Sequence, residues 1–131
     1  MSKRNLIILS TASLILAACQ STGAPPRAIP LGQTRVLDRL ISINEDCTST
    51  GEIVARLTQP PHNGSVQFKP TTDYPNFPKT NPRSACNRQK VAAIQVAYTP
   101  KPGFTGDDSF GIDIIFPNGV ARQSIYPVNV R

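Results

Sequence analysis

The stretch "YTPKPGFTGDDSFGIDIIF", from Tyr98 to Phe116, decides the fold class because turn residues lead directly into a regular alternation of side chains. The proline and glycines at positions 102–106 predict a turn. Beyond it, apolar side chains recur at every second position, which is the period of a β-strand with one face in the core. These apolar positions are Phe110, Ile112, Ile114 and Phe116. They alternate with Ser109, Gly111, Asp113 and Ile115, which share the opposite face. We therefore expect a half-buried strand here.

The segments on either side of this stretch also have strand patterns. In "VAAIQVAYTP", Ala92, Ile94, Val96 and Tyr98 share one face of a predicted strand. Downstream, the Pro-Asn-Gly sequence at 117–119 predicts a turn into a last strand, "VARQSIYPVNVR". Because Ile125 falls out of phase with the later valines of that strand, we expect a bulge near Tyr126 and Pro127.

The first half of the chain is less regular. "GEIVARLTQPPHNGSVQFKP" has two alternating runs around a Pro and Asn-Gly turn at 60–64, which predicts a β-hairpin. Thr34 to Asp46 fits either a helix face or a strand, and the strand is preferred. From Pro70 to Lys90 no period is sustained, which indicates a long loop.

Six or seven short strands, regular turn signals and no strong helix predict an all-β fold. We expect a small antiparallel Ig-like β-sandwich over residues 33–131, preceded by a signal peptide and a flexible tether. About 100 residues suffice for one domain but bury a limited surface.

The N-terminus reads as a targeting segment. Lys3 and Arg4 precede an apolar stretch that is too short to span a bilayer core of about 30 Å. It ends in Leu-Ala-Ala-Cys at 16–19, which resembles the lipoprotein box of bacteria. This resemblance implies a signal peptide over 1–18, an acylated Cys19 and a lipidated tether over 19–32. The alternative is an ordinary secretory signal. In the lipoproteins that this box resembles, an Asp after the cysteine signals retention in the inner membrane. Gln20 in its place therefore favours the outer membrane, with the domain in the periplasm.

Two further cysteines are suited to a cross-link. Once Cys19 is assigned to lipid, Cys47 and Cys86 remain. Small domains outside the cytoplasm are often stabilised by disulfides, so we expect these two to form one. A zinc site is the competing interpretation, but two cysteines and one distant histidine do not supply four ligands.

One family resemblance adds to this interpretation. "LTQPPHNGSVQF", followed by "VAYTPKPGFTGDDSFGIDI", resembles the bacterial Ig-like, cadherin-like repeats, which have a Pro-x-x-Gly turn, then Tyr-x-Pro, then Gly-Phe-x-Gly-x-Asp-Ser-Phe. The resemblance covers residues 57–114 and implies the sandwich fold. The chain differs from the family in being a single copy, in its insertion around Cys86 and in its predicted anchor, so the family's adhesive role is not transferred.

Two groups of residues are candidate sites. Asp107 and Asp108 offer hard oxygens that calcium prefers, but the preferred interpretation is structural: Asp108 accepts backbone hydrogen bonds across the Gly106 turn and Asp107 is solvated. No metal or other cofactor is therefore expected.

The second group is basic and would contact an anionic glycan, peptidoglycan or lipid headgroup, the alternative being a solvated loop. It comprises Lys79, Arg83, Arg88, Lys90 and Lys101.

Composition and motifs favour an interaction protein over an enzyme. Of 14 Lys and Arg residues two lie in the signal segment, so the remaining 12 exceed the 8 Asp and Glu only by four. With no interleaving of aromatic and basic residues, nucleic acid is not an expected partner. His62 near Ser65 is the sole hint of catalysis, and its turn context favours a solvated side chain.

The expected function is accordingly that of a non-catalytic, lipid-anchored cell-envelope protein that acts through protein or polymer contacts. The alternatives are an anionic ligand-binding module, or an accessory lipoprotein of a secretion or pilus assembly with free strand edges for pairing.

Overall fold

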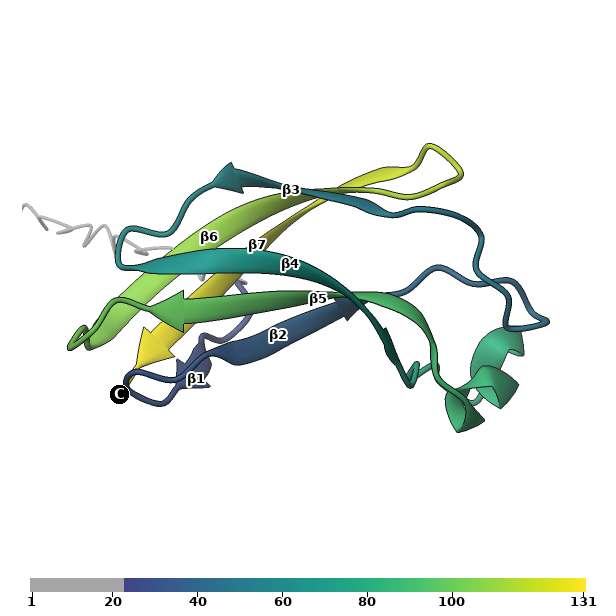
Figure 1. The fold of residues 1–131 in the computed structure, drawn as a ribbon, viewed down its shortest axis with the longest axis horizontal. Helices are drawn as coiled ribbons and strands as arrows, with labels where there is room; N and C mark the ends of the chain where they lie inside the picture. Colours follow the sequence, from purple (N-terminus) through teal and green to yellow (C-terminus); the bar gives the residue numbers. More distant parts are fainter. Residues whose placement is uncertain (1–22) are drawn as a thin grey trace, which may run out of the picture.

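The computed structural model describes residues 23–131, which form two packed β-sheets (Figure 1). The predicted all-β sandwich is confirmed. Cys19 and the expected signal peptide over 1–18 lie outside the described residues. No helix among residues 23–131 is long and apolar enough to cross a membrane. The elements in chain order are β1 (Arg27–Ile29), β2 (Arg35–Leu40), β3 (Val54–Gln59), β4 (Gly64–Asp73), the 3-10 helix η1 (Pro82–Arg88), β5 (Val91–Pro100), β6 (Gly106–Ile115) and β7 (Ala121–Val130).

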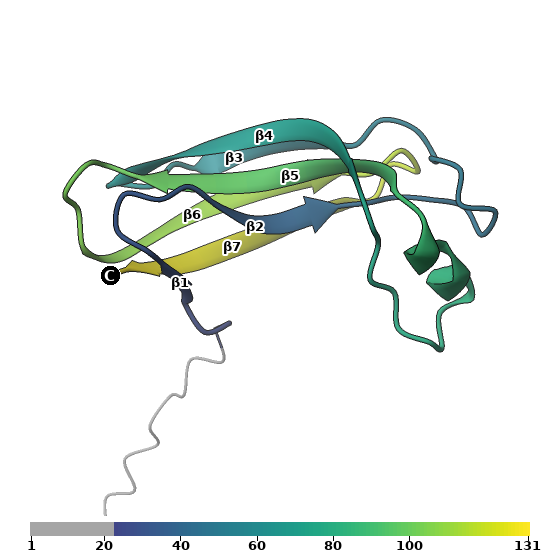
Figure 2. The ribbon, with the colours of Figure 1, turned by 60° about the horizontal axis from the view of Figure 1, so that its bottom comes forward.

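The strand order is that of an immunoglobulin sandwich. One sheet has the order β1-β7-β6-β3 and the other β2-β5-β4. With strands lettered in chain order, the second to seventh strands form the B-E-D and C-F-G sheets of that fold. All pairs are antiparallel except β1 with β7, which are parallel. Figure 2 shows the two layers, with η1 beyond one end.

In β6 the core lies where the sequence alternation placed it, whereas in β5 Val91 and Ala93 are buried in place of the expected Ala92. Phe110, Ile112 and Ile114 of β6 are fully buried, and Phe116 is partly buried against the same cluster. The Phe110 ring stacks between two tyrosine rings, with centroid distances of 6.0 Å to Tyr98 and 5.0 Å to Tyr126. Such aromatic pairs contribute about 0.5–1.5 kcal/mol each beyond the burial of their surface.

The predicted hairpin around residues 60–64 is wrong. β3 pairs with β6 and β4 pairs with β5, so the connection between β3 and β4 crosses from one sheet to the other. Pro60 and Pro61 have no N–H to donate to a hairpin ladder. The next two N–H groups, of His62 and Asn63, donate instead to Asp108 on β6. Local turn chemistry was read correctly, but it does not tell which strands pair.

Part of the expected tether is a strand. Arg27–Ile29, inside the expected tether of 19–32, forms β1 and pairs with residues 128–130 of β7. Ile29 is fully buried in the core. The described β-structure therefore begins at Arg27 rather than at residue 33. Although the surrounding segment is mostly polar, these three residues add a parallel strand beside β7 and place one side chain in the core.

Three smaller predictions are settled as well. Thr34 to Asp46 contains the strand β2, and its helix-like spacing arises from an irregularity between Val36 and Asp38. The expected bulge in the last strand is wrong, since β6 and β7 pair without a register shift and Ile125 points outward. The predicted loop of 70–90 begins only after β4 ends at Asp73 and contains η1.

The predicted disulfide is present. Cys47 and Cys86 are bonded, with Cα atoms 5.5 Å apart. Cys86 is fully buried in a second apolar cluster with Ile43 and Val91, so the bond attaches η1 to the segment after β2. A cross-link over a sequence separation of 39 residues stabilises a fold by about 4 kcal/mol in the chain-entropy model.

Candidate functional site

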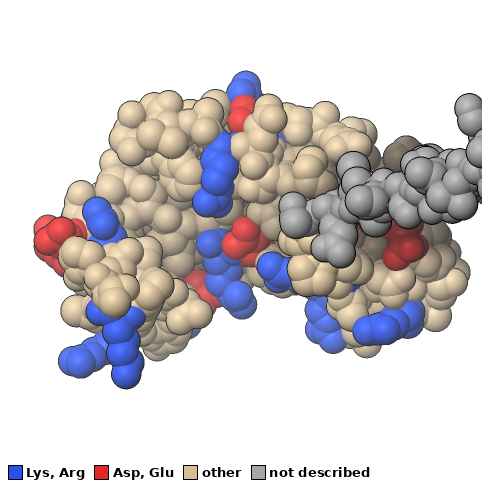
Figure 3. Space-filling view, turned by 180° about the vertical axis from the view of Figure 1, so that it is seen from behind, with Lys and Arg blue, Asp and Glu red and all other residues tan. Residues whose placement is uncertain are grey.

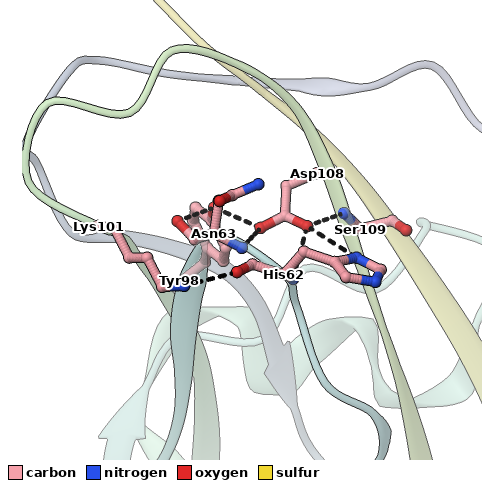
Figure 4. A network of polar contacts seen from close by, with 6 residues as sticks. All are labelled: His62, Asn63, Tyr98, Lys101, Asp108 and Ser109. Atoms are coloured by element: carbon pink, nitrogen blue, oxygen red, sulfur yellow. Dashed lines mark hydrogen bonds and ion pairs between the residues drawn. The ribbon is translucent and has the colours of Figure 1, made fainter.

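Asp108, the first candidate, sits at the centre of a polar network that joins the two sheets (Figure 4). Its Oδ1 accepts hydrogen bonds from the backbone N–H groups of His62, at 3.0 Å, and Ser109, at 2.9 Å. Its Oδ2 accepts from the N–H of Asn63, at 2.9 Å, and from the hydroxyl of Tyr98, at 3.0 Å. Only the Ser109 bond is local. The expected bonds across the Gly106 turn are replaced by bonds from the β3–β4 connection, 45 and 46 residues away.

The network keeps this buried carboxylate ionised. Burial by itself would raise the pKa of Asp108, but the three N–H donors and the tyrosine hydroxyl outweigh it and hold the pKa below its ordinary value. Burial and the neighbouring carboxylate raise the pKa of Tyr98, so its hydroxyl stays protonated as a donor. With two donors on each oxygen, the Asp108 carboxylate is fully engaged in holding the fold.

Asp107 and Asp108 line one open hollow of about 430 Å³, but their carboxylates have different hydrogen-bond partners. Asp107 Oδ1 accepts a hydrogen bond of 2.7 Å from Asn129 Nδ2 across β6 and β7, so Asp107 is not merely solvated as expected. In the part of the chain that the structure describes, no three His, Cys, Asp or Glu side chains gather as metal ligands would.

His62 contributes its backbone rather than its ring. Its side chain is 85% exposed, and Nδ1 lies 3.9 Å from Asp108 Oδ1. Its carbonyl oxygen accepts a 2.8 Å hydrogen bond from Lys101 Nζ. Within the described residues 23–131 no hydrogen bond joins Ser65 to the imidazole of His62, so the structure does not bring together the two residues that were the hint of catalysis.

The five basic residues of the second candidate do not form one surface. Lys101 follows β5 and Lys90 precedes it, so about 30 Å of strand separates them. Arg83 is partly buried, and its Nε donates a 2.6 Å hydrogen bond to the carbonyl of Ile43. Lys79 and Arg88 remain exposed at the η1 end. On the face in Figure 3, Lys and Arg side chains occupy separate groups, some beside Asp and Glu.

Topology instead reveals an open side of the sandwich, which we define by its two free edge strands, β3 and β4. Each strand ends its sheet, and Figures 1 and 2 show both on the same side of the molecule. Within the described residues no hydrogen bond joins β3 to β4. Their outer N–H and C=O groups are available to another chain.

Apolar side chains lie between these two edges. Leu57 of β3 is opposite Ile112 and so faces inward, yet it is 39% exposed because no strand covers it. Val66 and Phe68 of β4 are partly buried against the core. At the η1 end a hollow of about 280 Å³, which Ile53 helps to line, continues the open side.

The opposite side is closed by polar contacts between the sheets. Arg27 Nη1 on β1 donates a 2.9 Å hydrogen bond to the carbonyl of Leu37 on β2. The hydroxyl of Tyr126 on β7 donates at 2.6 Å to Asp38 Oδ2 on β2. The contrast singles out the β3–β4 side as the surface on which another chain could add a strand. Sequence reasoning missed it because the hairpin prediction paired β3 with β4.

Comparison with known proteins supplies no family. No protein-family model matches the chain, and no curated protein sequence matches it.

Proposed function

We propose that the chain is a non-catalytic, lipid-anchored protein of the bacterial cell envelope that binds an extended segment of a partner protein along the open β3–β4 side. The observation that carries this proposal is the pair of uncovered edges with partly exposed core side chains between them. An added strand would satisfy the free backbone groups of an edge, while its alternate side chains would cover Leu57 and its neighbours.

The lipoprotein box supports the anchor, and Gln20 after Cys19 supports the outer membrane as location. Positions 20–26 alone separate Cys19 from β1. At about 3.5 Å per extended residue they reach about 25 Å, so the domain would stay close to the bilayer. A partner would then be another envelope protein within that distance.

Photocrosslinking in intact cells tests the partner surface. A photoreactive amino acid at Leu57 should give a discrete crosslinked product that mass spectrometry identifies. Val36, on the edge strand β2, is a matched control because it is 37% exposed against 39% for Leu57. Equal products from both positions, or none from Leu57, would contradict the proposed surface.

The anchor is tested separately. The N-terminal peptide from membranes should carry an acyl mass on Cys19, and Cys19→Ala should remove it. An unacylated N-terminal peptide in the native protein would rule out the anchor without affecting the partner surface.

A further inference from the structure

A further hollow, of about 460 Å³, is lined by residues of β1, β2 and β7 and by the segment that follows β4. This volume falls in the range of about 300–1,000 Å³ typical of small-molecule sites. Its lining combines three arginines with the aromatic side chains Tyr74, Phe77 and Phe116. We call it the arginine groove, defined by Arg27, Arg39 and Arg122.

The arginines come from three different strands, and their charges are only partly compensated. Arg39 pairs with Asp73. Arg27 uses one of the five N–H groups of its guanidinium on the Leu37 carbonyl. Arg122 lies over the Phe116 ring, 5.6 Å from its centroid, and makes no ion pair with any acidic residue in the described range.

Among the described residues, the carboxylate in the groove makes no ion pair with Arg122. Asp38 is the acidic residue of the lining, and both of its oxygens already have donors. Oδ2 accepts the Tyr126 hydroxyl at 2.6 Å, and Oδ1 accepts the backbone N–H of Arg39 at 2.8 Å. Three cations around one hollow therefore face two carboxylates, those of Asp38 and Asp73, which leaves a positive surplus. Lys90, 5.8 Å from the centroid of the Tyr74 ring, adds a further cation near the groove.

We propose that the arginine groove binds an acidic sugar, a ring-shaped molecule carrying a carboxylate or phosphate. Guanidinium N–H groups form paired hydrogen bonds with both oxyanions, and an anion would relieve the repulsion among the arginines. The ring would pack against the aromatic side chains of the lining. The residues that line the groove lie outside β3 and β4, although Asp73 at the end of β4 pairs with Arg39. The two proposals also name different ligands, so either can fail without the other.

Nuclear magnetic resonance of the arginine Nε–H signals provides the test, on the purified full-length protein at low salt. The probes are N-acetylmuramic acid as the carboxylate sugar, glucose 6-phosphate as the phosphate sugar, N-acetylglucosamine as the neutral ring, and acetate as the carboxylate without a ring. We expect saturable shifts with one or both acidic sugars, and at least tenfold weaker binding of acetate and the neutral ring. The relative affinities of the two acidic sugars identify the anion.

Two variants place the response in the groove. Arg122→Gln should weaken binding of the acidic sugar at least tenfold. Arg88→Gln, an exposed arginine of η1 outside the groove, should leave it unchanged. The proposal is overturned by equal binding of N-acetylglucosamine or acetate, by unchanged binding in Arg122→Gln, by an equal loss in Arg88→Gln, or by no saturable shift with either acidic sugar.

Discussion

The hydroxyl of Tyr98 on β5 donates a 3.0 Å hydrogen bond to Asp108 Oδ2 on β6, and this bond joins the two sheets of the sandwich at one end. Both residues lie in the conspicuous stretch of the sequence, ten positions apart. Their contact makes the aspartate part of the core architecture, and it leads to the first two predictions.

Replacing Asp108 by Asn should destabilise the protein by about 2–4 kcal/mol. The substitution replaces one carboxylate oxygen, which accepts hydrogen bonds, by an NH2 group, which is a donor and would face the donors that the oxygen now binds. Urea denaturation measures the loss. Asp107→Asn is the matched control, since that side chain makes a single exposed hydrogen bond, and it should cost much less. Equal losses in both variants, or a large calcium-dependent stabilisation removed by Asp108→Asn, would contradict the structural role.

Acid should destabilise the fold partly through Asp108. Its pKa in the folded state lies below the ordinary value of 3.8, so folding favours the ionised form. The corresponding stabilisation is fully present above pH 3.8 and is lost as the pH falls through the lower, folded-state pKa. The free energy of unfolding, measured from pH 6 downward, should begin to decrease at about pH 4. Asp108→Asn should reduce this dependence, and the remainder should come from groups such as Asp46 and Asp73, whose pKa values are also lowered. An unchanged slope in the variant would refute this assignment.

Removing the disulfide should cost about 4 kcal/mol in the chain-entropy model. The double variant Cys47→Ser, Cys86→Ser removes the bond, and its melting temperature should fall well below that of the oxidised protein. The wild-type protein treated with a reductant is the control and should unfold at a similarly lowered temperature. A melting temperature that is insensitive to both treatments would show that the cross-link does not constrain the unfolded chain as expected.

Gly64→Ala should be among the most damaging single-methyl additions. A Cβ at Gly64 would lie 2.5 Å from carbon atoms of the Tyr98 ring, which is fully buried and has no room to move. Overpacking of this kind costs about 1–3 kcal/mol or more. Gly23→Ala is the control, because nothing lies within 4 Å of its added Cβ. Similar stabilities of the two variants in chemical denaturation would contradict the packing described around Tyr98.

Sequence reasoning succeeded where the information is local. The alternation from Phe110 to Phe116 identified a strand and its buried face, and the cysteine count predicted the pair Cys47 and Cys86. It failed at residues 60–64, where the turn was recognised but its topology was not. It also failed at β1, because three residues are too few to show a period.

The sequence by itself determined that the segments of β2 to β7 are strands, and which face of most of them is apolar, because a period of two along the backbone is a local property. Only the tertiary structure decided which strands are neighbours, and therefore that β3 and β4 are free edges and that arginines from three strands surround one groove. The physical reason is that strand pairing and the hydrogen bonds of Asp108 join residues far apart in sequence. Their choice depends on how the whole core packs, and no single segment encodes it.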